Sequence, residues 1–250
     1  MSREAPPTYP LIRNVGLSGM LVSFGDQLDE ATNRATLAFR GAVNELGLSG
    51  VVETATSLAS VFVRFDAADL SHDRLRGVLA DLLQTGDWRE APLPQGRRFW
   101  RVPTVYGTEL APQLAEAADL AGLSEAAAID ELGAARVRVL TIGFAPGQPY
   151  LGTLGETWDI PRQSEVTPQV PVGALVLAIR QFVLFSTASP TGWRHVGQTG
   201  LTLFQPEAAD PFALRAGDEL QFEPVSRAAF QRLRDSGAEQ GGAIVSEVTS

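Results

Sequence analysis

The 250-residue sequence contains no cysteine and no lysine, and it has only two histidines, His72 and His195. Without cysteine the chain has no disulfide framework, and two histidines leave few ligands for a transition-metal site. The absence of lysine excludes a Schiff-base lysine, the phosphate-binding lysine of a Walker motif and a biotinyl-lysine within this chain. All 20 basic residues are arginines.

The sequence also lacks an apolar run long enough to span a membrane, and its opening residues lack the apolar segment of a signal peptide. These features favour a cytoplasmic protein. The formal net charge of −9 argues against a nucleic-acid-binding surface, which needs basic side chains to neutralise phosphates. With 44% hydrophobic residues, the chain can build the core of one large or two ordinary domains.

The first hundred residues show a β-α-β-β-α-β pattern. Asp29 and Ser71 are predicted to cap the two helices, and the predicted strands are residues 19–24, 51–55, 60–65 and 97–105. This order predicts a ferredoxin-like α+β domain over residues 1–105, with both helices on one face of an antiparallel sheet. Two more helical patterns follow, so residues 106–135 are predicted to form a helical connector.

From Val137 onward, short apolar runs alternate with glycine and proline. Further predicted strands are residues 175–179, 182–185, 201–204 and 220–222, and residues 226–234 are predicted to form a short helix. Many short strands with dense turn signals predict a β-barrel or β-sandwich over residues 136–250.

The segment Gly143 to Gly152 combines three glycines and two prolines with two aromatic residues, directly after a strand-like run. Such a composition brings the backbone close to a ligand or to another chain. A tight corner between domains is the alternative interpretation.

Several short motifs follow one another in a characteristic order. They are Phe24-Gly25-Asp26, Val105 to Glu109, Gly143 to Gly152, Pro161-Arg162, Val170 to Gly173, Ala188 to Arg194, Gly197 to Thr199 and Leu203 to Pro206. In this order the chain resembles the family of 5-oxoprolinase B subunits, also called the allophanate hydrolase subunit 1 or Kip-type kinase inhibitor family. The resemblance extends over nearly the whole chain.

This resemblance implies a cyclophilin-like barrel for residues 136–250. It implies a subunit of an ATP-dependent complex that hydrolyses 5-oxo-L-proline to L-glutamate, with ATP shared by the complex and no metal or biotin bound by this chain. The implied partners are a larger protein, of the type of allophanate hydrolase subunit 2 or the 5-oxoprolinase C subunit, and a LamB/YcsF-type protein. The alternatives are a component of a urea or allophanate pathway and a non-catalytic inhibitor of a sensor histidine kinase.

Three residues are candidates for a catalytic role on the basis of this resemblance. Tyr106 and Glu109 fall in the family's CYGGE-like motif, but they also fit a strand-end tyrosine and a glutamate in the first turn of a helix. Arg162 fits a site for an anion or for a partner's carboxylate, and equally a surface ion pair.

The candidate residues for binding substrate or partner lie in the glycine- and proline-rich motifs or in the predicted strands beside them. They are Phe144, Pro146, Gly147, Tyr150, Gln181, Ser189, Trp193 and Arg194. Trp193 fits a core position as well as a stacking wall. Gln181 lies where the family carries a glycine-rich run, of which this chain keeps the glutamine and loses the glycines. We expect the turn Gly143 to Gly152, Arg162, Ser189 and Trp193 to converge at one end of the barrel.

Overall fold

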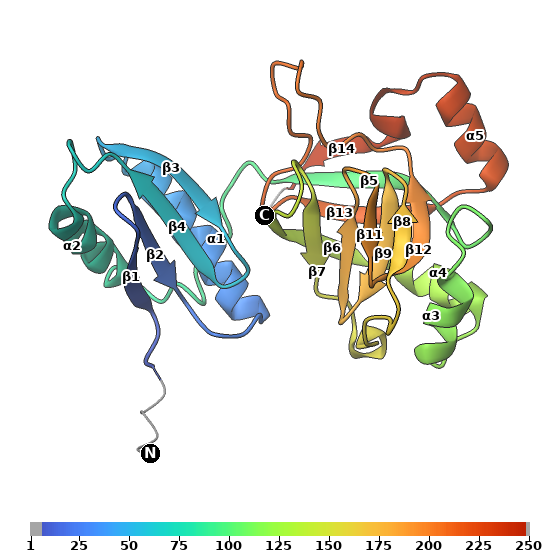
Figure 1. The fold of residues 1–250 in the computed structure, drawn as a ribbon, viewed down its shortest axis with the longest axis horizontal. Coiled ribbons are helices and arrows are strands. Elements are labelled where there is room, and N and C mark those ends of the chain that lie inside the picture. Colours follow the sequence, from blue (N-terminus) through green and yellow to red (C-terminus); the bar gives the residue numbers. More distant parts are fainter. Residues whose placement is uncertain (1–6, 249–250) are drawn as a thin grey trace. The chain divides into compact units, whose positions relative to one another are not determined.

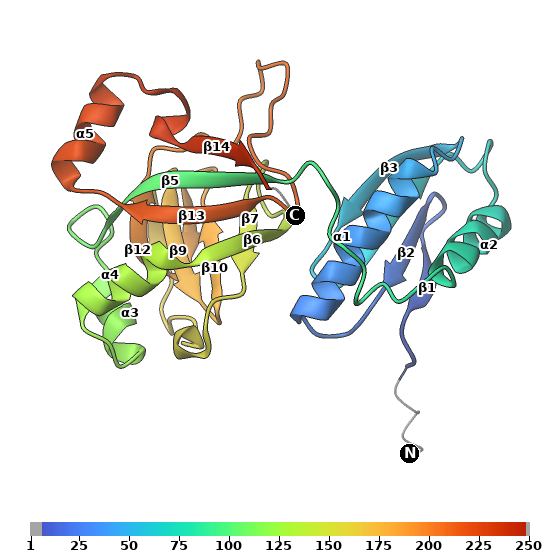
Figure 2. The same ribbon diagram turned by 180° about the vertical axis from the view of Figure 1, so that it is seen from behind.

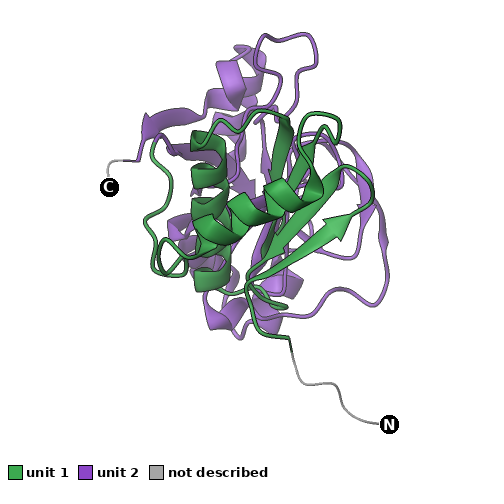
Figure 3. Ribbon diagram, turned by 90° about the vertical axis from the view of Figure 1, so that its left-hand side faces the viewer, with its two compact units in different colours: residues 1–95 green, residues 96–250 purple. Residues whose placement is uncertain are grey.

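The computed structural model describes residues 7–248, in which the chain forms two compact units divided between Gln95 and Gly96 (Figure 3). Each unit has a hydrophobic core of its own. None of the helices in the described residues is long and apolar enough to cross a membrane.

The first unit consists of a four-stranded antiparallel sheet and two helices, which share one hydrophobic core (Figure 1). Its elements are β1 (Leu11–Val15), β2 (Gly19–Ser23), α1 (Glu30–Glu45), β3 (Val51–Thr56), β4 (Ser60–Phe65) and α2 (His72–Leu83). The strands lie in the order β1-β2-β4-β3. One face of the sheet is covered, because both helices contribute to the same core cluster as β2 and β4.

Local sequence signals account for these elements. Asp29 accepts a hydrogen bond from the Thr32 backbone N at 2.6 Å and Ser71 accepts one from Arg74 N at 3.3 Å, so both predicted helix caps are confirmed. Every second side chain of β4 is buried in the core of the unit, as the two-residue period of a strand requires; these are Val61, Val63 and Phe65.

The predicted ferredoxin-like connectivity is wrong in one strand. The fourth strand of this sheet is β1, which precedes the others and pairs with β2, whereas the predicted strand 97–105 lies in the second unit as β5 (Arg98–Tyr106). Trp100 and Val102 of β5 are buried in the barrel core, which holds the strand there. The first unit therefore has the order β-β-α-β-β-α.

The second unit is built around a closed seven-stranded barrel in the order β12-β9-β10-β7-β6-β13-β5, and pairing between β5 and β12 closes the ring. Figure 2 shows β5 between β13, its neighbour in the ring, and β14, which pairs with β5 from outside the ring. The remaining strands are β6 (Arg136–Ile142), β7 (Pro149–Gly152), β8 (Thr167–Val170), β9 (Ala174–Ala178), β10 (Gln181–Leu184), β11 (Ser189–Thr191), β12 (Arg194–Thr199), β13 (Glu219–Pro224) and β14 (Ile244–Glu247). β8 and β11 form a separate two-stranded sheet.

The helices of this unit are α3 (Leu114–Leu120), α4 (Glu125–Ala134), η1 (Glu156–Trp158), α5 (Arg227–Asp235) and η2 (Glu239–Gly242). The division of the chain differs from the predicted limits of 105 and 135. Leu114 of α3 and Leu132 of α4 belong to the same core cluster as the barrel strands, so residues 106–135 are part of the barrel unit rather than a separate connector. The predicted strand 201–204 forms only an isolated bridge, between Phe204 and Phe212.

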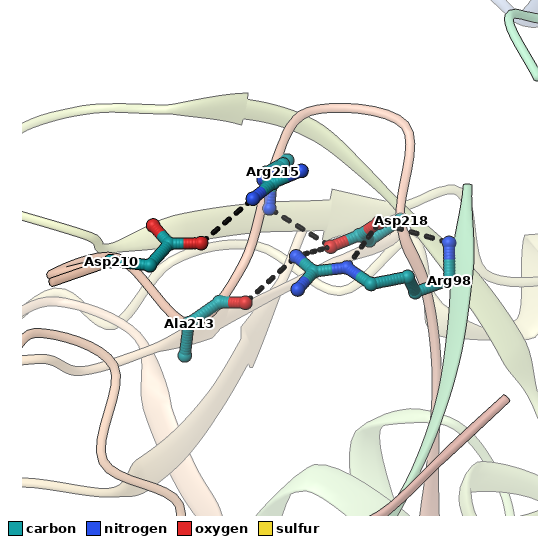
Figure 4. A network of polar contacts seen from close by, with 5 residues as sticks. All are labelled: Arg98, Asp210, Ala213, Arg215 and Asp218. Carbon is teal, nitrogen blue, oxygen red and sulfur yellow. Dashed lines mark hydrogen bonds and ion pairs between the residues drawn. The ribbon is translucent and has the colours of Figure 1, made fainter. Parts of the chain in front are cut away.

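A buried carboxylate fixes the start of β5 against the loop that precedes β13 (Figure 4). Asp218 is 2% exposed and accepts hydrogen bonds from the backbone N of Arg98 at 3.1 Å and of Arg215 at 2.9 Å. Asp218 Oδ2, which accepts from Arg215 N, also lies 2.5 Å from the Arg98 guanidinium, and that guanidinium donates to the Ala213 carbonyl at 2.8 Å. Four donors from two chain segments thus satisfy one carboxylate.

Candidate functional site

A groove on the second unit collects many of the residues that the sequence singled out. We call it the aromatic groove. It has a volume of about 460 Å³, and its walls include Phe144, Tyr150, Arg162, Val166, Pro190 and Trp193. These residues come from the β6–β7 turn, the segment after η1, and β11 with the residues that follow it. The expected convergence of these loops is therefore present for Phe144, Tyr150, Arg162 and Trp193.

The β6–β7 turn presents Phe144 to solvent. Gly143 N donates to Gln148 O at 3.0 Å and Gln148 N donates to Ala145 O at 3.1 Å, which closes the turn, while the last four residues of the motif form β7. Phe144 has a φ of +74° and its side chain is 76% exposed. A positive φ at a phenylalanine is a strained conformation, so the turn holds this large apolar side chain in water at a cost in stability.

Gly147 serves the packing of this turn rather than the groove itself. It is buried, its φ is +72°, and a Cβ at this position would lie 2.8 Å from the Leu203 carbonyl oxygen. Only glycine fits a positive φ at such a close backbone approach. Pro146 is exposed on the same turn and is not part of the groove wall.

Trp193 is the centre of the groove. Its ring meets the ring of Tyr150 edge-on with centroids 6.3 Å apart, and the Arg162 guanidinium carbon lies 5.4 Å from its centroid. The Gln163 side chain donates to the Trp193 carbonyl at 2.9 Å, which ties the segment carrying Arg162 to the end of β11. This arrangement presents a cation over an aromatic wall, which suits an anionic or planar group.

Four other candidates lie outside the groove. Tyr106 is in the barrel core, where its hydroxyl donates to Phe222 O at 3.0 Å. Burial raises the pKa of Tyr106, so the phenol stays protonated and holds β5 to β13. Gln181 is buried in β10 opposite Gly152, and Ser189 pairs with Val170 in the small sheet.

Arg194 is the fourth of these residues, and it is 5% exposed. It forms an ion pair with Glu116 of α3 at 2.9 Å and also donates to the Pro161 carbonyl. The side chain therefore joins α3 to the segment before Arg162, and its position is structural.

Glu109 lies in a second depression, which we call the polar cavity. This cavity has a volume of about 640 Å³ and is lined by Glu109, His195, Gln198, Phe230 and Arg234 among others. The Glu109 carboxylate forms an ion pair with Arg227. Gln198 and Arg234 are not among the predicted site residues. Nothing in the local sequence pattern distinguishes a glutamine that lines a cavity from one that binds neighbouring backbone.

The chemistry available differs between the two depressions. The residues that line the aromatic groove include one guanidinium and the two side-chain amides of Gln148 and Gln163, but no carboxylate and no histidine. Within residues 7–248 no cluster of three or more histidine, cysteine, aspartate or glutamate side chains is suited to a metal ion. The aromatic groove is thus equipped for binding and positioning rather than for a complete catalytic cycle.

Comparisons with known proteins give a consistent result. The family model described as "Carboxyltransferase domain, subdomain C and D" matches residues 10–214. A protein of Bacillus subtilis (strain 168), named as the B subunit of 5-oxoprolinase, is 29% identical over 231 residues, which cover 90% of this chain and 96% of the relative. A protein of the same name from Escherichia coli O157:H7 is 38% identical over 138 residues, which cover 55% of this chain and 63% of the relative.

Two solved structures share the fold. The crystal structure of TTHA0988 has a TM-score of 0.69 and 27% identity, over 86% of this chain and 40% of that one. The urea carboxylase of Kluyveromyces lactis has a TM-score of 0.68 and 18% identity, over 95% of this chain and 24% of that one, which is a likeness of fold alone.

Proposed function

We propose that this chain, which belongs to the family of carboxyltransferase subdomains C and D, is a subunit of an ATP-dependent 5-oxoprolinase complex. The relatives named as B subunits of 5-oxoprolinase support this assignment. The complex would hydrolyse 5-oxo-L-proline to L-glutamate. The cyclophilin-like type of barrel is part of the same proposal.

The observation that carries the proposal is the composition of the aromatic groove. Arg162 and Trp193 form a preorganised wall, and the exposed Phe144 stands beside them, yet the residues lining the groove include no carboxylate and no histidine. A groove of this kind is half of a site. A larger carboxyltransferase-type protein, similar to allophanate hydrolase subunit 2 or the 5-oxoprolinase C subunit, would cover it and supply the missing groups.

In this proposal ATP transfers its γ-phosphoryl group to the carbonyl oxygen of the lactam and ADP leaves. Water then adds to the activated carbon, the ring C–N bond breaks, and a second water releases phosphate, which gives L-glutamate. The ATP would be shared with the complex, because a chain without lysine has no Walker-type phosphate loop of its own. A LamB/YcsF-type protein would be the third component.

The test is reconstitution. The purified chain alone is expected to hydrolyse neither ATP nor 5-oxo-L-proline. Mixed with the larger partner and the LamB/YcsF-type protein, it should form a complex by light scattering and release ADP and glutamate in equal amounts. Robust turnover by the isolated chain would show that the site is not shared.

Further assays on the same preparation distinguish the two alternative functions, a component of a urea or allophanate pathway and an inhibitor of a sensor kinase. Turnover of urea or allophanate, but not of 5-oxo-L-proline, would assign the chain to a carboxylation or allophanate pathway. Binding to a sensor kinase with loss of its autophosphorylation, and no turnover in any complex, would make the chain a regulator.

A further inference from the structure

Two glutamines from distant parts of the sequence meet at the wall of the aromatic groove. Gln163 lines the groove and directly follows Arg162, and Gln113 stands at the N-terminal end of α3. The Nε2 of Gln113 donates to the Oε1 of Gln163 at 2.6 Å. We call these two residues the glutamine pair. It joins α3 to the segment that carries Arg162.

Backbone groups at both ends set the orientation of the two amides. The backbone N–H of His195 can only donate, and it donates to Gln113 Oε1 at 2.7 Å, which turns the Nε2 of Gln113 toward Gln163. The carbonyl of Trp193 can only accept, and it accepts from Gln163 Nε2 at 2.9 Å. Reversing either amide would bring two donors or two acceptors together, so one arrangement alone satisfies the glutamine pair.

Gln163 is fixed at further points, and with it the position of its neighbour Arg162. Its backbone N donates to the Gly192 carbonyl at 2.7 Å, and its Nε2 also donates to Thr167 Oγ1 at 3.3 Å. These bonds keep the segment of Arg162 beside Trp193, whose ring centroid lies 5.4 Å from the Arg162 guanidinium carbon.

Helix α3 gives the glutamine pair a firm base. Leu114 of this helix is buried in the barrel core. Gln113 occupies the N-cap position, but its side chain makes no capping hydrogen bond with the first turn of α3, all of which the structure describes. Arg194 donates to Glu116 of α3 and to the Pro161 carbonyl, so the same segment stays attached to α3 when the glutamine pair is broken.

We propose that Gln113 and Gln163 are positioning residues of the aromatic groove, which hold Arg162 over Trp193 in the free chain. Gln113 is not among the described residues that line the groove, so it acts through Gln163. A wall fixed in advance loses little ordering entropy when it is occupied. That the occupant is the larger carboxyltransferase-type protein rests on the proposed function, whereas the positioning rests on the contacts of the glutamine pair.

Gln113→Glu breaks the glutamine pair at a single atom. At pH 7 the new carboxylate still accepts from His195 N but has no hydrogen to donate to Gln163. If Gln163 reverses its amide to donate to the carboxylate, it loses its bond to the Trp193 carbonyl instead. Hydrogen exchange of the Gln163 backbone amide in the full chain, without partner, measures the result. We expect its protection factor to fall about fivefold.

Lowering the pH restores the missing donor in this variant. A protonated carboxyl group carries one O–H, and a carboxyl that is partly buried and faces a carbonyl oxygen should titrate above the usual value of about 4.3. The protection factor of Gln113→Glu should therefore recover as the pH falls from 7 to 5. Gln113→Leu has no donor at any pH and should show no recovery. The charged or titratable neighbours, Glu116, Arg194 and His195, are the same in both variants, so their effects cancel in the comparison.

Gln221→Glu is the matched control. Gln221 also donates its Nε2 to a backbone carbonyl, that of Gly133 at 2.9 Å, and it does not line the groove. This substitution should leave exchange at Gln163 unchanged. In calorimetric titrations with the larger partner at pH 7, the dissociation constant should rise about fivefold for Gln113→Glu and stay unchanged for Gln221→Glu.

Unchanged protection at Gln163 in Gln113→Glu, or a recovery at low pH that Gln113→Leu shares, would overturn the inference. A partner affinity that Gln113→Glu leaves unchanged would overturn it as well. If the unmodified chain binds no larger partner while the exchange results are as expected, the proposed function fails and the positioning of this segment by the glutamine pair stands.

Discussion

The guanidinium of Arg162 lies over the ring of Trp193 at 5.4 Å, and the ring of Tyr150 meets the same tryptophan edge-on at 6.3 Å. Three segments of the second unit, including strand β7, thus share one aromatic centre. Because Trp193 is 7% exposed while Arg162 stands in solvent, the tryptophan is the fixed part of this arrangement and the arginine the part available to a partner.

Replacing Arg162 or Tyr150 with alanine should impair assembly or activity of the reconstituted complex. Arg162→Ala should change the free energy of unfolding by about 0.5 kcal/mol or less, because an exposed polar position contributes little to stability. Tyr150→Ala should cost about 1 to 2 kcal/mol without unfolding the chain, because Tyr150 is partly buried against the cluster that contains Trp193. Light scattering with the partner and urea denaturation measure the two effects. Arg215→Ala is the matched control, since the side chain of that arginine forms an exposed ion pair with Asp210 and the substitution keeps its backbone N–H. Unfolding of both groove variants would instead identify the motif as a structural corner.

Asp218→Ala should destabilise the second unit by about 3 kcal/mol, because it leaves the partly buried Arg98 guanidinium and two backbone N–H groups without their acceptor. Urea denaturation followed by tryptophan fluorescence measures the change. Asp210→Ala removes an exposed carboxylate from the same network and should cost less than about 1 kcal/mol. Equal effects of the two substitutions would contradict the role given to Asp218.

Ile179→Gly should raise the free energy of unfolding by about 1 kcal/mol, because Ile179 has a φ of +45° in the β9–β10 turn, where a β-branched residue is strained. The residue is 40% exposed, so the apolar burial lost on substitution offsets part of the strain that glycine relieves. Its backbone N still donates to Ile160 O, at 2.8 Å in the native turn. The opposite change, Gly147→Ala, should destabilise, because the new Cβ approaches the Leu203 carbonyl. A melting temperature lowered by Ile179→Gly would show that the isoleucine side chain matters more than the strain.

Stability should fall as pH drops through about 6.5, in part because of His195. Burial lowers its pKa in the folded chain, so below the unfolded value the unfolded chain takes up a proton that the folded chain does not, and the equilibrium moves toward unfolding. His195→Gln should reduce the slope of melting temperature against pH between about 5 and 7. His72→Gln is the control, and an unchanged slope in His195→Gln would exclude this contribution.

Local periodicity was sufficient for much of the first unit. The caps at Asp29 and Ser71 and the alternation of Val61, Val63 and Phe65 are decided within a few residues of each element, so they are visible in the sequence. The edge strand β1 was missed because its outward residues are polar or exposed and its pattern is incomplete. β5 was assigned to the wrong sheet because strand propensity does not specify a pairing partner.

The candidate site was predictable where glycine and proline mark its segments, and not where contacts between distant segments place a side chain. Phe144, Tyr150, Arg162 and Trp193 lie in or beside such segments and meet in the aromatic groove. Gln198 lies in a motif too, but the motif does not reveal that its Nε2 donates to the carbonyls of Val172 and Thr199.

The closure of the barrel has a consequence for the order of events during synthesis. Thr104 of β5 pairs with Thr199 of β12 and, on its other side, β5 runs parallel to β13. A ribosome adding roughly 5 to 20 residues per second leaves β5 without its neighbours for several seconds. Within that interval the first unit, whose strands pair with near neighbours in sequence, can fold, whereas β5 stays an open edge that a chaperone or another nascent chain can occupy.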